Sequence, residues 1–529
     1  MLSVSTRSAA VAVAPPTPQP EVPAVTAAVL GLLAAAAALG AGQLAAALVS
    51  PSSSPFFAVA DTAIRLSPEW LTEFGKSLGP VLDKLLLQVG VGAAVAGLAV
   101  VAGLTARRHP ARGVALIAVL GVLGLLAVVF APAFGLLDVI APLVALLAGT
   151  GALAWLVRLA RDTRPPVSDG PSRRTVLIGA STAVGVLATG AGAGALALGS
   201  GGVEDSRRIV TAQLQRARLV ERAPAVPASA AFPELGTPAF VTPNPSFYRI
   251  DTALQIPAQP AADWAMRIHG MVDEPIDLNF ADLLARPLVE RTITMTCVSN
   301  PVGGDLVSTA NFIGVELRDL LLEAGIRPGA DQIFSTSRDG WFTGTPTDVV
   351  MERGRGALLA IGMNGEALPP EHGFPVRMVV PGLYGFVSAT KWIADMELTT
   401  FAARQGYWLQ RGWAQKAPIK TQTRIDAPRG FATVPAGTVS VAGVAWAQHT
   451  GVDRVEIRMD GGAWRDATLA TDVNPNTWRM WHAEFDLAAG SHTVQTRATD
   501  RSGITQTEVR TNPIPDGASA WPATIFSVA

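Results

Sequence analysis

Cysteine is almost absent from this chain: Cys297 is the single one among 529 residues. One cysteine excludes an intramolecular disulfide, a cysteine-ligated iron–sulfur cluster and a C-x-x-C-H haem attachment site. If the chain performs redox chemistry, electrons have to pass through a separate partner, such as a cytochrome or a quinone-linked protein.

Charge is scarce as well, because only 16% of the residues are charged and the mean hydropathy is +0.34. Soluble domains average about 25% charged residues, so membrane segments are implied before any is located. The 41 basic and 42 acidic residues nearly cancel, which gives no overall attraction to nucleic acid, and no nucleic-acid partner is expected. The length predicts more than one structural unit.

Long apolar runs fill the amino-terminal part of the chain. Each of five runs approaches the roughly 20 residues that cross a ~30 Å hydrocarbon layer as a helix. Arginines between the second and third runs, and between the fourth and fifth, place both connections in the cytoplasm. The runs are Ala24–Ser50, Leu86–Ala106, Gly113–Phe134, Leu136–Val157 and Val176–Gly199. The pattern predicts a multi-pass anchor in the cell membrane over residues 1–202, with everything after it extracytoplasmic.

The fifth run opens with Ser172-Arg173-Arg174-Thr175-Val176-Leu177. Paired arginines ahead of a weakly hydrophobic stretch resemble a twin-arginine export signal, which carries proteins that fold around a cofactor before crossing the membrane. The same arginines also satisfy the positive-inside rule, so both interpretations stay open.

The rest of the chain divides into three parts. Residues 203–246 are first charged and then proline-rich, which predicts a linker without regular structure. Residues 247–424 mix extended runs with a helix at Leu317–Ala324, which predicts an α+β domain. Residues 425–529 hold short alternating strands and turn signals, which predict an immunoglobulin-like β-sandwich. The predicted fold class is therefore multi-domain: an α-helical membrane bundle, an α+β domain and a β-sandwich.

Cys297 ends an extended run and is followed by Val298–Gly304, a stretch that must turn. A thiol at a strand end beside a glycine-containing loop is suited to bind a soft metal as thiolate. The alternative is a buried cysteine that acts as a small apolar residue.

A second motif lies downstream, with H-G-F-P-V-R at His372–Arg377, a P-G-x-x-G loop at Pro381–Gly385, and Lys391 followed by Trp392. Its basic side chains are donors suited to a phosphate and a polar ring system. The alternative is that they form ordinary surface pairs.

Together, these motifs and the T-x-T-C-x-x-N around Cys297 resemble the sulfite oxidase family of molybdopterin-dependent oxidoreductases. The resemblance runs from about Phe240 to the carboxyl terminus, and it points to a membrane-anchored bacterial member of the actinobacterial type. It implies a molybdenum–molybdopterin cofactor and a two-electron oxygen-atom transfer on a small molecule. The sandwich resembles the family's dimerisation domain, which implies a homodimer.

Residue roles follow from the same resemblance. It implies that Cys297 is the metal ligand and that Cys297 and Arg249 are the catalytic residues. It implies that the cofactor is held by Arg249, Cys297, Asn300, Asp339, His372, Arg377, Ser388, Thr390 and Lys391.

The substrate stays open between two sulfur compounds. Arg249 and Arg411 would attract an anion such as sulfite. Sulfite-oxidising members place a tyrosine after the K-W motif, where this chain has Trp413. A reductase of sulfoxides, including methionine sulfoxide, is therefore the alternative within the family, and a non-catalytic surface scaffold is the alternative of another class.

Overall fold

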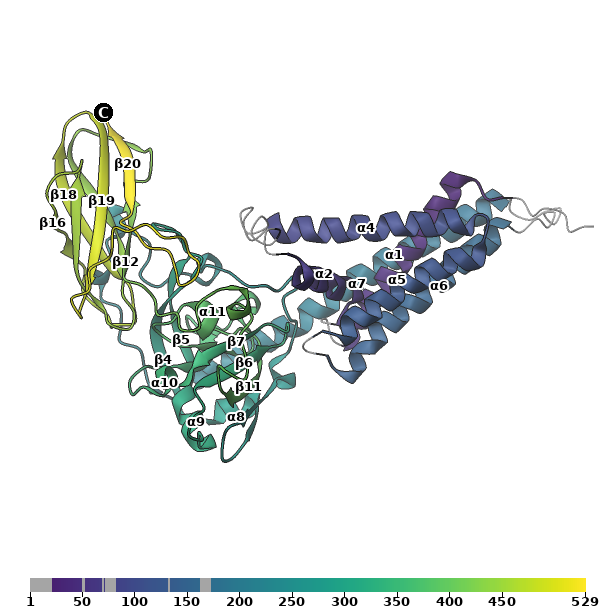
Figure 1. Cartoon of the computed structure of the whole chain (residues 1–529), viewed down its shortest axis with the longest axis horizontal. Helices are drawn as coiled ribbons and strands as arrows, with labels where there is room; N and C mark the ends of the chain where they lie inside the picture. The colour runs from purple at the N-terminus through teal and green to yellow at the C-terminus, as the bar shows by residue number, and fades with distance from the viewer. Residues whose placement is uncertain (1–20, 50–52, 69–70, 72–81, 132–133, 162–172) are drawn as a thin grey trace, which may run out of the picture. The chain divides into compact units, whose positions relative to one another are not determined.

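The computed structural model describes residues 21–49, 53–68, 71, 82–131, 134–161 and 173–529 (Figure 1). Contacts divide the chain into two compact units, one made by most of the chain up to Ala197 and the other running from Leu198 to Ala529.

Four helices of the first unit are long and apolar enough to cross a membrane, counted over the described residues. They are α1 (Ala24–Val49), α4 (Leu82–Ala106), α5 (Pro110–Val129) and α6 (Ile140–Arg161) with the 3-10 turn Leu136–Val139 before it. A shorter helix, α2 (Pro55–Leu66), follows α1. The four long helices agree with the first four predicted segments.

The fifth predicted segment, Val176–Gly199, is helical but is not one of those four. It lies in α7 (Arg173–Arg216), whose apolar part, counted over the described residues, is Ile178–Ala191. The fifth membrane segment therefore stays a prediction. The twin-arginine-like motif begins at Ser172, which lies outside the described residues.

Glycines let two helices of the first unit pack backbone to backbone. A Cβ added at Gly31 of α1 would lie 2.0 Å from the Ala99 carbonyl oxygen, and one at Gly103 of α4 would lie 2.1 Å from that of Ala27. Such contacts are typical of helix pairs that associate without a hydrophobic driving force.

The predicted linker is wrong in its first part. α7 continues to Arg216, and Val203, Val210 and Leu214 are buried in the same core as the α+β region. The charged residues there occupy the outer face of an amphipathic helix, so their number does not indicate a spacer. The proline-rich remainder contains only the short strand β1 (Leu219–Glu221) and single 3-10 turns.

Two sheets form the α+β region of the second unit. The first runs in the order β1, β4 (Leu288–Thr296), β5 (Val307–Glu316), β8 (Leu358–Met363), β10 (Arg377–Val379), with β9 (Glu366–Ala367) beside β8. The second runs β3 (Ile276–Asn279), β2 (Ala265–Gly270), β11 (Ile393–Thr399), β6 (Gln332–Ser337), β7 (Phe342–Pro346). Helices α8 (Phe280–Ala285), α9 (Leu317–Ala324), α10 (Thr347–Met351) and α11 (Gly385–Ser388) complete it. The predicted α+β domain is confirmed.

The carboxyl-terminal region is rich in strands, as predicted. One sheet runs β12 (Gln422–Ala427), β14 (Gly437–Trp446), β18 (Arg479–Leu487), β17 (Thr468–Leu469). The other runs β13 (Thr433–Val434), β20 (Ala523–Val528), β19 (Gly490–Asp500), β15 (Val452–Met459), β16 (Arg465–Asp466). Apolar side chains of both sheets share one core. The immunoglobulin-like topology stays a prediction.

The ends of the helix α9 in this unit were predicted correctly from local sequence signals. The predicted helix Leu317–Ala324 has those bounds as α9, and Gly325 after it takes a φ of +67°. A left-handed residue after a helix is the usual glycine cap. The α9 helix buries Leu317, Leu320 and Leu321 in the core and leaves Leu322 exposed.

Candidate active site

Cys297 stands directly after β4, in a loop whose backbone is fixed by hydrogen bonds. Its amide donates to the Leu306 carbonyl at 2.9 Å, and its own carbonyl accepts from the Asn300 amide at 3.1 Å. The Asn300 side chain bridges the loop, because its Oδ1 accepts from the Leu306 amide at 2.9 Å. Burial raises the pKa of the Cys297 thiol, while hydrogen bonds from Ser299 and the charge of Lys391 oppose that rise. A positive group or a metal beside the thiol is needed to favour the thiolate.

The basic motif lies on three consecutive short elements. His372 ends the 3-10 turn Pro370–His372, Arg377 begins β10, and Lys391 stands just before β11. The electrostatic influence of Lys391 reaches Cys297, Asp339 and His372 alike. Lys391 therefore lies close enough to these three groups to act on them electrostatically, while the roles of the site residues stay predictions.

Gly373 makes this arrangement possible. Its φ is +108°, and a Cβ there would lie 3.0 Å from the Arg377 Cβ and 3.2 Å from the Cα and Cβ of Lys391. No side chain fits between the two basic residues at this point.

We expect Gly373→Ala to lower the free energy of unfolding by roughly 2–4 kcal/mol, through backbone strain plus displacement of its neighbours. Gly354→Ala is the matched control, because Gly354 also has a positive φ, +79°, but nothing lies within 4 Å of its added Cβ. Strain alone should cost Gly354→Ala about 1 kcal/mol. Equal losses in the two thermal unfolding curves would show that the contact with Arg377 and Lys391 carries no energy.

His372 is a neutral acceptor. Its Nε2 lies 3.3 Å from the Asn244 carbonyl oxygen, which can only accept, so Nε2 carries the proton and Nδ1 carries the lone pair. Burial, together with the charges of Lys391 and Arg377, lowers the pKa of His372 to about 3. Nδ1 is buried and has no hydrogen-bond partner among the described residues. A ligand here would have to offer His372 an N–H or O–H donor.

Lys391 and Arg249 share one carboxylate. The Asp251 Oδ2 accepts from Lys391 Nζ at 3.0 Å and from Arg249 Nε at 2.9 Å, and Lys391 also donates to the Glu371 carbonyl at 2.9 Å. Burial lowers the pKa of Lys391 to about 8, although Asp251 opposes the shift. The two cations, Lys391 and Arg249, share the single carboxylate of Asp251, so these three side chains together carry a net positive charge.

Arg377 is the most buried charge of the site, at 2% exposure. Its Nη1 donates to the His372 carbonyl at 3.1 Å, and its Nε is buried without a partner among the described residues. Burial lowers the pKa of its guanidinium to about 10. An anionic ligand would satisfy both the charge and the free donor.

Asp339 faces the same corner, whereas two of the predicted hydroxyl residues use their side chains elsewhere. Burial raises the pKa of Asp339, and its Oδ1 accepts from the Trp341 amide at 3.1 Å. Ser388 Oγ donates within its own loop, to the carbonyls of Leu383 and Tyr384 at 3.0 Å each. Thr390 Oγ1 lies 2.6 Å from Ser335 Oγ. The carbonyls of Ser388 and Thr390 also accept, from the amides of Val380 and Met378, so this segment is held by hydrogen bonds within the fold.

Arg411 and Trp413 lie in a neighbouring aromatic cluster. The Arg411 guanidinium stacks 3.7 Å from the Tyr407 ring and donates to the Tyr407 carbonyl. Trp413 is buried against Trp408 and Phe386. A direct role for Arg411 in drawing in a substrate therefore stays a prediction.

Sequence reasoning missed Tyr248, Asp251 and Asn244. Burial raises the pKa of the Tyr248 hydroxyl, with Cys297 adding to the rise and Arg377 opposing it, so this phenol belongs to the same site. Asp251 pairs with two basic site residues, and Asn244 holds His372. Their only sequence signal was their position next to the F-Y-R tripeptide that contains Arg249.

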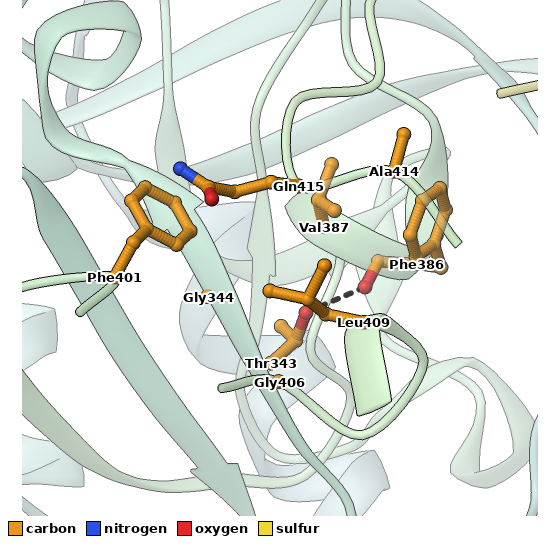
Figure 2. Close-up of a pocket in the computed structure, with 9 residues that line it drawn as sticks. All are labelled: Thr343, Gly344, Phe386, Val387, Phe401, Gly406, Leu409, Ala414 and Gln415. Atoms are coloured by element: carbon orange, nitrogen blue, oxygen red, sulfur yellow. Dashed lines mark hydrogen bonds between the residues drawn. The ribbon is translucent and has the colours of Figure 1, made fainter. Parts of the chain in front are cut away.

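A small pocket lies beside α11 (Figure 2). Phe386 and Val387 of α11 line it together with Thr343, whose hydroxyl donates to the Phe386 carbonyl at 2.6 Å. None of the predicted site residues lines this pocket. The pocket therefore does not coincide with the thiol and the basic motif.

Comparisons with known proteins identify the region that holds these motifs. Residues 253–408 match the family model of the oxidoreductase molybdopterin binding domain. Sulfite oxidase of Gallus gallus is 30% identical over 305 residues, which cover 49% of this chain and 66% of that protein. The uncharacterized oxidoreductase YuiH of Bacillus subtilis (strain 168) is 35% identical over 150 residues, which cover 28% of this chain and 72% of that protein.

One solved structure, the sulfane dehydrogenase SoxCD from Paracoccus pantotrophus, aligns with 55% of this chain and 81% of its own at 23% identity and a TM-score of 0.46. Among the sulfite oxidases, the chain spans 66% of the Gallus gallus protein and 55% of the mitochondrial protein of Macaca fascicularis. This chain belongs to the sulfite oxidase family of molybdopterin-dependent oxidoreductases. Its matched region is that of a molybdopterin-binding oxidoreductase, which implies a molybdenum cofactor.

The residues present fit that cofactor. Asn300 Nδ2, His372 Nδ1 and Arg377 Nε are buried polar atoms without partners in the described part of the chain. Buried polar groups are normally satisfied, so three unpartnered atoms among the residues predicted to bind the cofactor fit a polar ligand. No group of three or more His, Cys, Asp or Glu side chains in the described residues could hold a metal ion. A metal bound through Cys297 alone would have to bring its other ligands with it, as a pterin dithiolene does.

Lys391 makes the stability of the cofactor-free protein depend on pH. Its folded pKa of about 8 lies below the ordinary value of 10.5, so between these values the unfolded chain binds the proton that the folded chain has lost. The free energy of unfolding should therefore rise with pH across that window, by at most about 3 kcal/mol at about 1.36 kcal/mol per pKa unit.

The measurement is the difference in thermal unfolding between Lys391→Met and the wild type at several pH values. Below pH 8 the variant should be the more stable of the two, and its advantage should shrink as the pH approaches 10.5. Asp251 keeps Arg249 as a partner in the variant. A difference that stays constant over this range would contradict the assignment to Lys391.

Proposed function

We propose that this chain is a membrane-anchored, extracytoplasmic oxidoreductase that moves an oxygen atom to or from a small sulfur compound. The observation that carries the proposal is the charge of Lys391, which acts on both Cys297 and His372 and is joined to Arg249 through the carboxylate of Asp251. When bound, the molybdenum cofactor supplies the two-electron oxygen-atom transfer.

The chain's own residues hold and orient the cofactor. Cys297 supplies a thiolate to the metal, and Lys391 and Arg377 supply the positive charge that binds the pterin phosphate. His372 accepts a hydrogen bond from the cofactor through Nδ1, the atom left free by its contact with Asn244. Asp339 and Asn300 complete the polar contacts, and Ser388 and Thr390 contribute through the segment that leads to Lys391.

Arg249 is the residue that we assign to the substrate side. Its side chain is 39% exposed, which is far more than that of Arg377 or Lys391, and Asp251 fixes its direction. A partly exposed cation that shares Asp251 with Lys391 is suited to guide an anion such as sulfite.

The anchor is proposed for residues 1–202 and the redox domain for residues 247–424, followed by an immunoglobulin-like domain that pairs two copies. Contacts within the first unit support the predicted topology. Glu21 pairs with Arg107 at 2.9 Å and with Arg108 at 3.2 Å, and Arg161 donates to the Ala106 carbonyl at 3.2 Å. The connection after α4, the end of α6 and the residues just before α1 thus lie at one end of the bundle, the end expected in the cytoplasm.

The test has two steps, performed on the purified full chain. Molybdenum and pterin are measured first, and a protein from pterin-producing cells that contains neither would end the proposal. Turnover is then measured with sulfite plus an oxidised cytochrome, and separately with a reduced dye plus methionine sulfoxide. Activity in the first assay supports oxidation and activity in the second supports reduction; a loaded protein inactive in both would show that the substrate class is wrong.

The sulfoxide reductase is favoured by one observation, the tryptophan at position 413. Trp413 is buried, at 6% exposure, and stacks with other aromatic rings, so it offers no hydroxyl to a sulfite ion. The assay with methionine sulfoxide is therefore as important a test as the assay with sulfite.

A further inference from the structure

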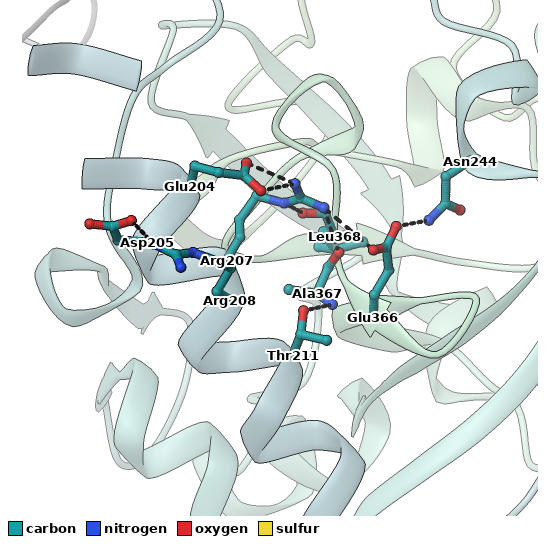
Figure 3. Close-up of polar contacts among 9 residues, drawn as sticks. All are labelled: Glu204, Asp205, Arg207, Arg208, Thr211, Asn244, Glu366, Ala367 and Leu368. Carbon is teal, nitrogen blue, oxygen red and sulfur yellow. Dashed lines mark hydrogen bonds and ion pairs between the residues drawn. The ribbon is translucent and has the colours of Figure 1, made fainter. Parts of the chain in front are cut away.

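The second half of α7 lies against the turn that carries His372. Val203, Val210 and Leu214 point into the core of the second unit, and a Cβ on Gly362 of β8 would lie 2.8 Å from the Leu214 Cδ1. Figure 3 shows the polar face of this contact, where α7 meets the residues between β9 and the turn.

Arg207 holds the backbone at this contact. Its Nε donates to the Leu368 carbonyl at 3.0 Å and its Nη2 to the Ala367 carbonyl at 3.4 Å, and its side chain is only 14% exposed. Thr211, one turn further along α7, accepts from the Ala367 amide at 3.0 Å. Leu368 is followed by Pro369 and Pro370 and then by the 3-10 turn that ends at His372, so the chain has little freedom between the two points.

A second path joins the same helix to the other side of His372. Arg207 Nη2 lies 3.9 Å from Glu366 Oε2, and Glu366 Oε1 accepts from Asn244 Nδ2 at 2.6 Å (Figure 3). Asn364 donates to Asn244 Oδ1 at 2.8 Å. The Asn244 carbonyl is the atom to which His372 donates through Nε2. Arg207 thus faces both the chain that leads into His372 and the residue that fixes its ring.

We propose that Arg207 is a positioning residue of the cofactor site, so that the second half of α7 is part of that site. This inference rests on the proposed role of His372 in holding the cofactor. Partners that orient a ligand-binding side chain typically matter by about 10–100-fold in affinity or activity. A histidine that must present Nδ1 to a ligand depends on the group that holds Nε2.

The test is the rate at which pterin leaves the loaded full chain after desalting. In Arg207→Gln that rate should rise about tenfold. Arg208→Gln is the matched control, because Arg208 is the next residue on α7, its side chain is 74% exposed, and it pairs only locally with Asp205. Pterin should leave Arg208→Gln at the rate of the wild type.

The variant Leu214→Ala distinguishes a positioning role of Arg207 from a purely structural one. It opens a cavity where the same helix packs against the core, but it leaves the hydrogen bonds of Arg207 in place. This variant should lose more thermal stability than Arg207→Gln and yet keep pterin better. Pterin loss that follows stability across both variants would overturn the inference. Unchanged retention in Arg207→Gln would do the same.

Asn244→Ala supplies a further readout. If both residues act on His372, the double variant Arg207→Gln with Asn244→Ala should release pterin little faster than the faster single variant. If the double variant instead releases pterin at a rate increased by the product of the two single effects, the two residues act independently. That result would contradict the proposal. A wild-type protein that never contains pterin refutes the proposed function instead, so the two failures are distinguishable.

Discussion

Replacing Cys297 by serine is expected to lower turnover by about a thousandfold or more, the range seen when a directly bonded catalytic group is removed. The hydroxyl is a much harder ligand than a thiolate and ionises far less readily, so a soft metal loses its one bond to the protein. Cys297 is the only cysteine, and no neighbouring thiol can replace it.

The substitution should leave the fold intact. Cys297 is 9% exposed and its backbone is held by Leu306 and Asn300, so the smaller side chain should cost about 1 kcal/mol of stability. Pterin content should fall less than activity, because Arg377 and Lys391 keep the phosphate. Thr296→Ser, one residue earlier on β4, is the control for packing and should remain active. A Cys297→Ser protein with near-normal turnover would remove the thiolate from the mechanism.

The two motifs that define the site could be predicted from the sequence because each is continuous. Cys297 ends a strand and begins a turn, and His372, Arg377 and Lys391 fall within a single stretch. Local rules for strands, turns and glycine are enough to recognise such segments.

The partners of these residues could not be predicted in the same way. Asp251 lies 140 positions from Lys391, and Asn244 lies 128 positions from His372. Asparagine and aspartate at these points look like ordinary turn residues in a proline-rich stretch. Only the tertiary fold gives them a role.

The helix α7 shows a second limit. The charges of Glu204, Asp205 and Arg208 and the prolines that follow suggested a linker, yet the apolar positions Val203, Val210 and Leu214 lie on one face of a helix. Composition averaged over the whole stretch hid that periodicity, which was present in the sequence.

The second large effect is expected for Arg377→Met, and it has opposite signs with and without the cofactor. Arg377 is 2% exposed and makes no ion pair with a carboxylate within the described residues. A buried charge without a counter-ion is costly, so replacing it by an apolar chain of similar length should stabilise the cofactor-free protein. Cofactor-free Arg377→Met should therefore unfold at a higher temperature than the cofactor-free wild type.

In the loaded protein the order should reverse. The pterin phosphate would compensate the charge, so the variant loses a charge-assisted contact and should retain cofactor about 100-fold less well. Arg424→Met is the matched control with the opposite sign, because Arg424 is also buried but donates to Asp426 at 2.7 Å, and its loss leaves that carboxylate unpaired. That variant should be destabilised with or without pterin. If cofactor-free Arg377→Met is destabilised like Arg424→Met, Arg377 already has the partners it needs, and the site is not built around an anion.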